Sequence, residues 1–318
     1  MPTGDRDEPG SSGPQISVHA KLDGPDITSV LDLVRAAAEA DDVSPLSEHV
    51  LLHLRYGGDS RARNLLLVSG GVVAGYAHLD PTDPVAGPSG ELVIHPAHRG
   101  QGLGLALLRA LIAETAPRPL RLWSHGDLPA AAALAAAAGF ERVRALWRMC
   151  RSLRAPLAEP KLAAGIAVRT FAVGRDEQAW LDLNAKAFAG HPEQGAWTRD
   201  DLSQREQEPW FDPAGFFLAE RAGQLAGFHW TKIHGRGGTG AAHEHQPIGE
   251  VYVVGVDPAE QGSGLGRALT LIGLRYLRAH GLSDVMLYVD AANTAAIRLY
   301  ESLGFTHQDT DVMFSNTA

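Results

Sequence analysis

The chain has 318 residues, of which 45% are hydrophobic and 20% are charged, a balance that is ordinary for a soluble globular protein of about two domains. Its formal net charge is −9, which excludes the strongly basic composition of a typical nucleic-acid-binding protein. Cys150 is the only cysteine, so an intramolecular disulfide is excluded and a reducing, cytoplasmic compartment is expected.

Residues 1–14 are rich in Gly, Ser, Pro and charge, which predicts a disordered tail. They lack the basic region and apolar run of a signal peptide, and no later apolar stretch is long enough to span a membrane. A first domain is expected over residues 15–154, a Pro-containing linker over residues 155–165 and a second domain over residues 166–318. Each half is long enough to bury its own core.

Both domains contain a strand-like run, then a glycine-rich loop, then an amphipathic helix. In the first domain these lie at residues 91–94, 99–104 and 103–115. The elements expected in the second domain are strands at residues 166–171, 216–219, 225–233, 250–256 and 285–289, helices at 176–187, 265–280 and 293–303, a helix opened by a capping box at 198–201, a loop at 236–246 and a closing strand after Gly304. The pattern predicts an α/β fold with a mixed, mainly antiparallel sheet and flanking helices in each domain.

The two glycine-rich loops form an internal repeat. Residues 95–104 align with residues 257–266 and share a Pro, an Ala, a Leu and three Gly. The glycines let backbone N–H groups converge, and the following helix adds the positive end of its dipole, so each loop predicts a diphosphate cradle. A Rossmann fingerprint would follow the first strand of its unit, and a P-loop would contain Gly-Lys-Ser/Thr; neither condition is met.

The motifs R-x-x-G-x-G and Q-x-x-G-x-G, each between a strand and a helix, resemble the acetyl-CoA loop of the GNAT superfamily of N-acetyltransferases. Residues 293–305, N-T-A-A-I-R-L-Y-E-S-L-G-F, resemble that superfamily's second signature. The resemblance covers nearly the whole chain as two tandem GNAT-type domains and implies acetyl-CoA as co-substrate. Residues 191–197, 210–213, 227–232 and 249–258 are similar to the mycothiol synthase family of two-domain acetyltransferases.

The resemblance implies which residues contact acetyl-CoA. Gly255 lies inside a β-branched strand, where a glycine marks either a weak packing position or a bulge or close backbone approach, and the resemblance assigns it to main-chain contact with the cofactor. The contacts implied in the second domain are Val254, Gly255, Val256, Gln261, Gly262, Ser263, Gly264, Leu265, Gly266, Arg267, Asn293, Thr294, Ala295, Ala296, Ile297 and Arg298. Those implied in the first domain are Leu92, Val93, Ile94, Arg99, Gly100, Gln101, Gly102, Leu103 and Gly104.

Acetyl transfer to an amine needs a base for the ammonium and an acid for the leaving thiolate. Tyr300 follows Asn293 by seven residues, about two helical turns, so both lie on roughly one face. The resemblance makes Tyr300 the acid, and the alternative is a core aromatic. Glu250 lies on a Val-rich strand on the same sheet face as Val256, and the resemblance makes it the general base, acting through water. The alternative for Glu250 is a strand-end carboxylate that faces water.

The first domain lacks these groups. Alignment places Pro88, Leu128 and Ala135 where the second domain has Glu250, Asn293 and Tyr300. Glu91 is shifted by an odd number of residues, onto the other sheet face. The first domain is therefore expected to be catalytically degenerate, either binding acetyl-CoA structurally or serving as a scaffold.

The resemblance also implies an acceptor, the amine of a cysteinyl-glucosaminyl-inositol, with the chain acting as a monomer without metal, nucleic acid or membrane. The acceptor contacts implied are Glu48, Glu193, Lys232, Glu250 and Tyr288. For Glu48 and Glu193 the alternative is a solvated loop charge. The H-x-H of His243 and His245 has no evident third ligand, so a surface loop is favoured over a metal site.

Two other functions stay open from sequence alone. One is a GNAT enzyme that acts on another amine, such as an aminoglycoside, a polyamine or a protein N-terminus. The other is a non-enzymatic acetyl-CoA sensor, which the retention of Glu250, Asn293 and Tyr300 in one domain argues against.

Overall fold

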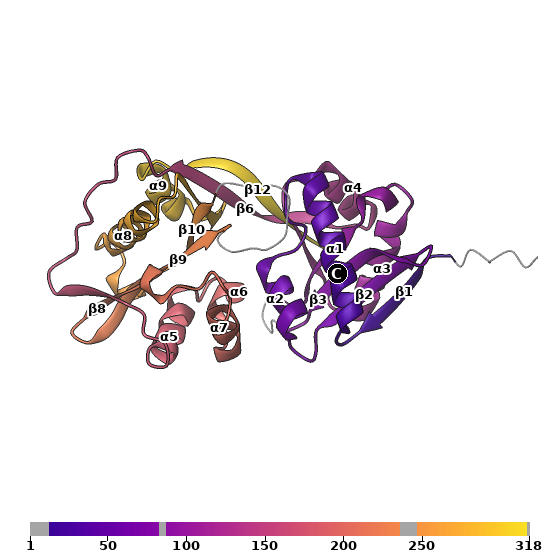
Figure 1. Ribbon diagram of the computed structural model, residues 1–318, viewed down its shortest axis with the longest axis horizontal. Helices are drawn as coiled ribbons and strands as arrows, with labels where there is room; N and C mark the ends of the chain where they lie inside the picture. Colours follow the sequence, from indigo (N-terminus) through magenta and orange to yellow (C-terminus); the bar gives the residue numbers. More distant parts are fainter. Residues whose placement is uncertain (1–12, 83–86, 236–246, 317–318) are drawn as a thin grey trace, which may run out of the picture. The chain divides into compact units, whose positions relative to one another are not determined.

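The computed structural model describes residues 13–82, 87–235 and 247–316, except for the side chains of Pro192 and Glu193. The chain divides into two compact units, formed by residues 1–143 with 312–318 and by residues 144–311 (Figure 1). Each unit has a mixed, mainly antiparallel sheet with flanking helices, so the expected fold class is confirmed. Residues 1–12 of the expected disordered tail lie outside the described residues.

The sheet of the first unit has the strand order β1-β2-β3-β4-β5-β12. Neighbouring strands are antiparallel except β4 and β5, which are parallel. The strands are β1 (Gln15–His19), β2 (Arg63–Ser69), β3 (Val72–Asp80), β4 (Ser89–Ile94), β5 (Arg121–Ser124) and the end of β12 (Thr306–Ser315). The helices are α1 (Gly24–Asp41), α2 (Glu48–Tyr56), α3 (Leu103–Thr115) and α4 (Pro129–Ala137), with a 3-10 turn η1 (Pro96–His98).

Alternate strand residues bury opposite faces of this sheet. Leu65 and Leu67 of β2 pack with α3 and α4 on one face, and Leu66 packs with α1 and α2 on the other. The first unit is therefore a three-layer α/β/α arrangement with two separate cores.

The second unit has the strand order β12-β6-β11-β10-β9-β8-β7, with β10 and β11 parallel. Its strands are β6 (Glu141–Ser152), β7 (Ile166–Thr170), β8 (Phe216–Arg221), β9 (Gln224–His234), β10 (Ile248–Val256), β11 (Asp284–Asp290) and the start of β12. Its helices are α5 (Glu177–Ala187), α6 (Pro192–Gly195), α7 (Arg199–Glu206), α8 (Leu265–Ala279) and α9 (Thr294–Ser302), with 3-10 turns η2 (Pro213–Gly215) and η3 (Pro258–Glu260).

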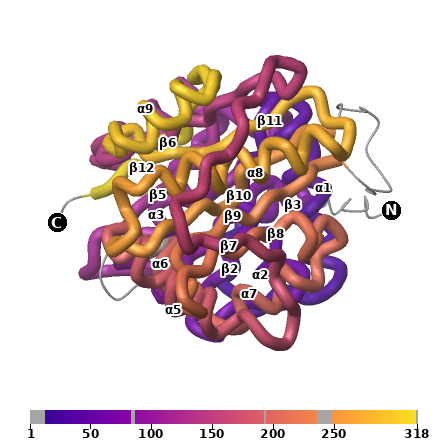
Figure 2. Tube along the Cα trace, turned by 90° about the vertical axis from the view of Figure 1, so that its left-hand side faces the viewer, coloured from indigo at the N-terminus to yellow at the C-terminus, as the bar shows by residue number. Residues whose placement is uncertain are grey.

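The two faces of the second sheet also differ. Helix α8 runs along β9 and β10 and buries a leucine face there (Figure 2). Helices α5 and α7 lie on the opposite face (Figure 1). They cover a cluster of aromatic rings there. At its centre Trp230 stacks on Phe216 at 4.5 Å and meets Trp180 edge-on at 5.8 Å.

The boundaries of the compact units differ from those expected for the sequence domains. Strand β6 pairs with β11, from Leu146↔Asp290 to Ser152↔Asp284, so it belongs to the second unit although it precedes residue 154. The end of β12 pairs with β5, from Val312↔Ser124 to Ser315↔Arg121, and belongs to the first unit. Sheet membership follows strand pairing rather than chain order. The division into a degenerate and a catalytic domain remains a prediction.

Helix starts differ in how their N–H groups are satisfied. At α7, Thr198 and Asp201 accept each other's backbone N–H groups, so the expected capping box is confirmed with Asp in place of Glu. Helices α3 and α8 begin after Gly102 and Gly264, and neither has a side-chain cap. Their first N–H groups are left available to other acceptors.

Within the described part of the chain, no helix combines the length and the apolar character needed to cross a membrane.

Candidate active site

The parallel strands β10 and β11 separate after a short contact. They pair only at Gly249↔Val285 and Glu250↔Met286. A bulge between Val251 and Val253 turns β10 relative to β9 just beyond this contact. At the end of β10, the backbone N–H and C=O groups on the β11 side are therefore not hydrogen-bonded to β11. These groups can pair with an extended ligand that lies between the two strands. Because of the extra residue at the bulge, Glu250 lies opposite Lys232 and Val256 opposite Gly227, an odd number of residues apart on β9, so the expected placement of Glu250 and Val256 on one sheet face was wrong.

The second glycine-rich loop lies directly after β10. Gly262 and Gly264 have φ values of 79° and 83°, in the left-handed region where a side chain would be strained. Among the described residues their N–H groups have no backbone acceptor, and α8 starts directly after Gly264. Gly266 faces Val256, and a Cβ there would lie 3.5 Å from the Val256 side chain and 4.0 Å from Leu299 of α9. The loop, the end of β10 and α9 thus converge around a nest of N–H donors suited to a diphosphate.

The structure explains Gly255 differently from the sequence analysis. A Cβ at this position would lie 2.5 Å from the ring of Phe228 and 3.2 Å from Ala187. The close approach is therefore made by a core side chain, and the bulge lies nearer the middle of the strand. Contact between the cofactor and the Gly255 main chain remains a prediction.

Glu250 is a buried carboxylate, with 7% of its surface exposed. It pairs with Lys232 across the β9–β10 ladder, so the two side chains lie on the same sheet face. His234 Nε2 lies 2.7 Å from Glu250 Oε2. The alternative of a strand-end carboxylate facing water does not fit this burial.

His234 is a site residue that the sequence analysis missed. Its signal was the hairpin register, because His234 lies two residues beyond Lys232 on the same face of β9. The register of a hairpin depends on the length and type of its turn. The sequence between β9 and β10 has no recognisable turn motif, so this register could not be predicted.

Two further predicted acceptor contacts lie around Glu250. The buried Lys232 ammonium lies 4.2 Å from the ring centroid of Trp210 and 5.0 Å from that of Tyr252, a cation–π arrangement. Tyr288 is partly exposed, and the partial burial of its ring, followed by the charges of Asp311 and Glu250, raises its pKa. Glu250 therefore pairs with Lys232 across the ladder, and its charge acts on Tyr288.

Helix α9 carries the other two predicted groups. Asn293 is its N-cap and accepts the N–H of Ala296 at 3.1 Å. Tyr300, about two turns later, is half-buried and meets Phe305 edge-on at 5.8 Å. A tyrosine is protonated at neutral pH at its ordinary pKa of about 10, and burial raises the pKa of Tyr300 further, to about 12, so its hydroxyl carries the proton that a donor needs. That hydroxyl makes no hydrogen bond within the part of the chain that the structure describes.

The first unit repeats the frame of the site. Strands β4 and β5 pair only at Ser89↔Arg121 and Gly90↔Leu122 before they separate. A cleft of about 650 Å³ lies between the separated strands, the first glycine-rich loop and α4. Its volume is in the range of small-molecule pockets. Arg99 at its edge forms two hydrogen bonds of 2.7 Å with Asp41.

The chemistry of the second unit is not repeated there. Because β10 has a bulge and β4 has none, Ser89 rather than Pro88 lies opposite Asp80 in the way that Glu250 lies opposite Lys232. The expected equivalence with Pro88 was wrong by one residue, but the position still has no carboxylate. Ala135 is buried in the core at the predicted Tyr300 position.

Glu91 has a structural role. It lies two residues from Ser89 on β4 and therefore on the same face as Ser89, so the expected shift to the other sheet face was wrong. Its carboxylate accepts the N–H of Ser47, the N-cap of α2, at 2.7 Å, and lies 3.5 Å from His125 Nε2. Burial alone would raise its pKa, but the hydrogen bonds from His125 and Ser47 lower the pKa of Glu91 below its usual value. Glu91 therefore stays ionised and ties α2 to the sheet.

The remaining predicted side chains are not joined to this site. Glu48 is the first residue of α2, in the first unit, and its contact with the acceptor stays a prediction. Glu193 lies in α6, but its side chain, like His243 and His245, lies outside what the structure describes.

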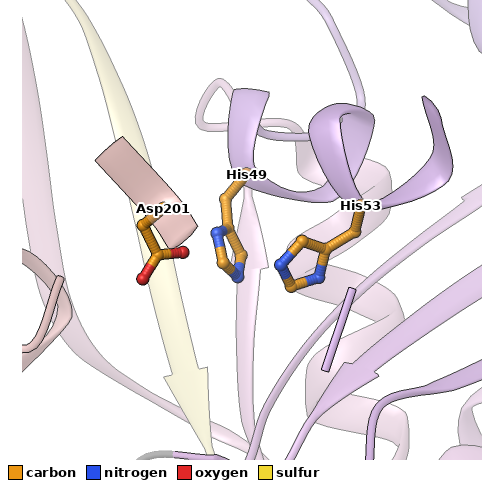
Figure 3. Close-up of side chains that lie close together, drawn as sticks. All are labelled: His49, His53 and Asp201. Carbon is orange, nitrogen blue, oxygen red and sulfur yellow. The ribbon is translucent and has the colours of Figure 1, made fainter. Parts of the chain in front are cut away.

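His49 and His53 lie one turn apart on α2 with ring centroids 3.9 Å apart (Figure 3), and His49 Nε2 is 3.2 Å from Asp80. Two nitrogens and a carboxylate already hydrogen-bonded to one of them are a weak basis for a metal site.

Comparisons with known proteins agree with this geometry. A model described as the acetyltransferase (GNAT) family matches residues 178–305, and one described as an acetyltransferase (GNAT) domain matches residues 61–142. The chain is 58% identical to a mycothiol acetyltransferase of Streptosporangium roseum, over 94% of this chain and 98% of that protein. It is 64% identical to a mycothiol acetyltransferase of Thermobispora bispora, over 91% and 95% of the two chains.

Solved structures show the same tandem fold. A GCN5-related N-acetyltransferase from Sphaerobacter thermophilus matches with a TM-score of 0.66 and 26% identity, over 94% of this chain and 95% of that chain. A tandem GNAT protein from the clavulanic acid biosynthesis pathway matches with a TM-score of 0.70 over 95% and 98%. At 23% identity the latter supports the fold alone.

Proposed function

Since the chain belongs to the mycothiol acetyltransferase family of GNAT acyltransferases, we propose that its second unit acetylates the cysteine amine of the cysteinyl-glucosaminyl-inositol precursor of mycothiol. Acetyl-CoA is the acetyl donor. The observation that carries the proposal is the combination, in one unit, of the splayed strands, the nest at Gly262 and Gly264, and two protonatable groups with suitable environments. Those groups are the buried Glu250 and the protonated Tyr300.

In this proposal the acceptor amine attacks the thioester carbonyl directly. Glu250 takes a proton from the incoming ammonium, directly or through a water. Tyr300 donates its proton to the departing thiolate, whose conjugate thiol has a pKa of about 8.5. The products are an amide, free CoA thiol and one proton. Lys232 and Tyr288 are proposed to hold the acceptor beside Glu250, and Glu48 and Glu193 to add contacts to its hydroxyl-rich part.

The residues proposed to hold acetyl-CoA are those of the Q-x-x-G-x-G loop, the end of β10 and the start of α9. Backbone N–H groups suit the diphosphate, because the net charge of −9 offers no general attraction for an anion. The cleft of the first unit is proposed to bind a second acetyl-CoA without turning it over. We propose a monomeric enzyme, and the single cysteine supports a reducing, cytoplasmic setting.

The test is a free-thiol assay with acetyl-CoA and a panel of amines: the cysteinyl-glucosaminyl-inositol, an aminoglycoside, a polyamine and a peptide with a free N-terminus. Thiol release is expected with the first amine at a kcat/KM well above the others. A higher value for another panel member would reassign the acceptor, and no release with any amine, despite acetyl-CoA binding, would favour a sensor. Glu250→Gln serves as the control for uncatalysed thioester loss.

A further inference from the structure

The proposed reaction produces a proton that must leave the site in every turnover. An ammonium loses two protons when it becomes an amide. One proton replaces the proton that Tyr300 gives to the departing thiolate. Glu250 takes the other proton. The inference below rests on that proposed function, because Glu250 accumulates a proton only if it is the base.

Glu250 is poorly placed to release this proton directly to water. Its side chain is only 9% exposed, whereas the imidazole of His234, at 2.7 Å from its carboxylate, is 36% exposed. His234 thus lies between the buried carboxylate and the solvent. The carboxylate contact occupies only Nε2, and the imidazole has a second nitrogen, Nδ1, that can exchange a proton.

The other charged and titratable groups around Glu250 are unsuited to this transfer. Lys232 lies opposite Glu250 and presents its ammonium to the rings of Trp210 and Tyr252, and an ammonium has no lone pair to accept a proton. On β11, Tyr288 is a phenol whose ordinary pKa is about 10, and partial burial and the charges of Asp311 and Glu250 favour its protonated form, so it keeps its proton at neutral pH. Imidazole can accept at one nitrogen and release from the other at neutral pH.

We propose that His234 is the proton relay between Glu250 and solvent. In each turnover the protonated Glu250 gives its O–H proton to Nε2 of neutral His234, which becomes an imidazolium. The Nδ1–H bond then breaks, and that proton goes to water. Exchange with water restores the starting tautomer, and Glu250 is again a carboxylate.

The experiment compares His234→Gln and His234→Ala in the full chain, with saturating substrates and weak buffer. Glutamine can still donate an N–H to Glu250 but cannot carry a proton. Both variants are expected to lose roughly tenfold in kcat with the KM for acetyl-CoA unchanged, and added imidazole is expected to restore most of the rate. Wild type and His307→Gln, a change at an exposed histidine on β12, should not respond to imidazole.

Two results would overturn the relay. Full activity of His234→Gln would mean that the hydrogen bond alone is needed, and a slow variant that imidazole does not restore would mean that His234 positions Glu250 without moving a proton. His234→Gln keeps the test decisive if His234→Ala does not fold. Glu250→Gln separates the two levels of the argument. If it is fully active, the proposed base is wrong; if it is slow while His234→Gln is not, only the relay is wrong.

Discussion

Burial raises the pKa of Tyr300, the residue proposed to act on the leaving group. Its ring packs against the core of the second unit beside Phe305, while its hydroxyl has no hydrogen bond among the described residues. From sequence alone, a core aromatic and a proton donor are alternative roles for Tyr300. The structure makes them compatible, because the same packing that buries the ring raises the pKa to about 12.

Tyr300→Phe keeps the ring and removes the proton. We expect kcat to fall about a hundredfold, with acetyl-CoA affinity near normal, because only the stabilisation of the departing thiolate is lost. Single-turnover rates with chemistry limiting provide the measurement. An unchanged rate would remove Tyr300 from the mechanism.

Glu250→Gln keeps the shape of the side chain and an oxygen that can accept from His234, but it cannot take a proton. The acidic limb of the pH dependence of kcat/KM is expected to weaken or disappear, because that limb reports protonation of the base in the free enzyme. A profile of unchanged shape and height would leave Glu250 as a substrate contact only.

A different histidine, His229, makes the free energy of unfolding depend on pH. His229 is fully buried, with Nδ1 at 2.8 Å from the Leu269 carbonyl oxygen, and burial lowers its pKa to about 4. Above pH 6.5, the ordinary value, neither the folded nor the unfolded state binds this proton. As the pH falls toward 4, only the unfolded state binds it, so the free energy of unfolding decreases.

Between about pH 7.5 and pH 5 this decrease amounts to about 2 kcal/mol. Urea unfolding of wild type and His229→Gln at the two pH values measures it. Wild type should lose more stability on acidification than the variant, and His307→Gln should behave like wild type. The same pH dependence in His229→Gln and wild type would contradict the assignment.

At the scale of elements, the two strand–loop–helix segments offer a matched comparison. Gly102 and Gly264 are both N-caps with φ near 80°, and a Cβ at either would meet no other atom within 4 Å. A substitution therefore strains the backbone of the nest without a side-chain clash.

Gly264→Val is expected to abolish turnover by distorting the diphosphate nest of the second unit. Gly102→Val should instead lower stability or remove one of two acetyl-CoA sites, with turnover largely retained. Calorimetry counts the sites, and steady-state rates rank the variants. Equal loss of turnover in two folded variants would mean that the first unit takes part in catalysis.

These segments also show what sequence can predict. The observed bounds of α3, α8 and β10 lie within two residues of those expected, because glycine at positive φ and apolar periodicity are local properties. The phase of Asn293 and Tyr300 was equally local. The bulge at Val251–Val253, the partner of Glu250 and the obstacle at Gly255 all depend on which strand or ring lies alongside, and local patterns carry no such information.

At the scale of the whole molecule, the units and the expected domains divide the chain differently. Met149 and Leu153 are buried in the core of the second unit, and Val312 and Phe314 in that of the first. A cut at the expected boundary would therefore remove core residues and a strand from both sheets.

Residues 166–318 expressed alone should be less stable than residues 144–318, which keep β6. The loss of two fully buried apolar side chains costs several kcal/mol, on the order of 2–5 for each. Thermal unfolding followed by circular dichroism compares the two fragments. Equal melting temperatures would show that β6 contributes little to the second unit.

The pairing of Val312–Ser315 with β5 has a consequence for how the protein is made. The ribosome synthesises β1 to β5 first and this last strand only after the whole of the second unit. The sheet of the first unit therefore stays one strand short throughout synthesis of residues 144–311, and β5 waits with an unpaired edge until the polypeptide is nearly finished. Of the two units, the one synthesised first is the last whose sheet can be completed.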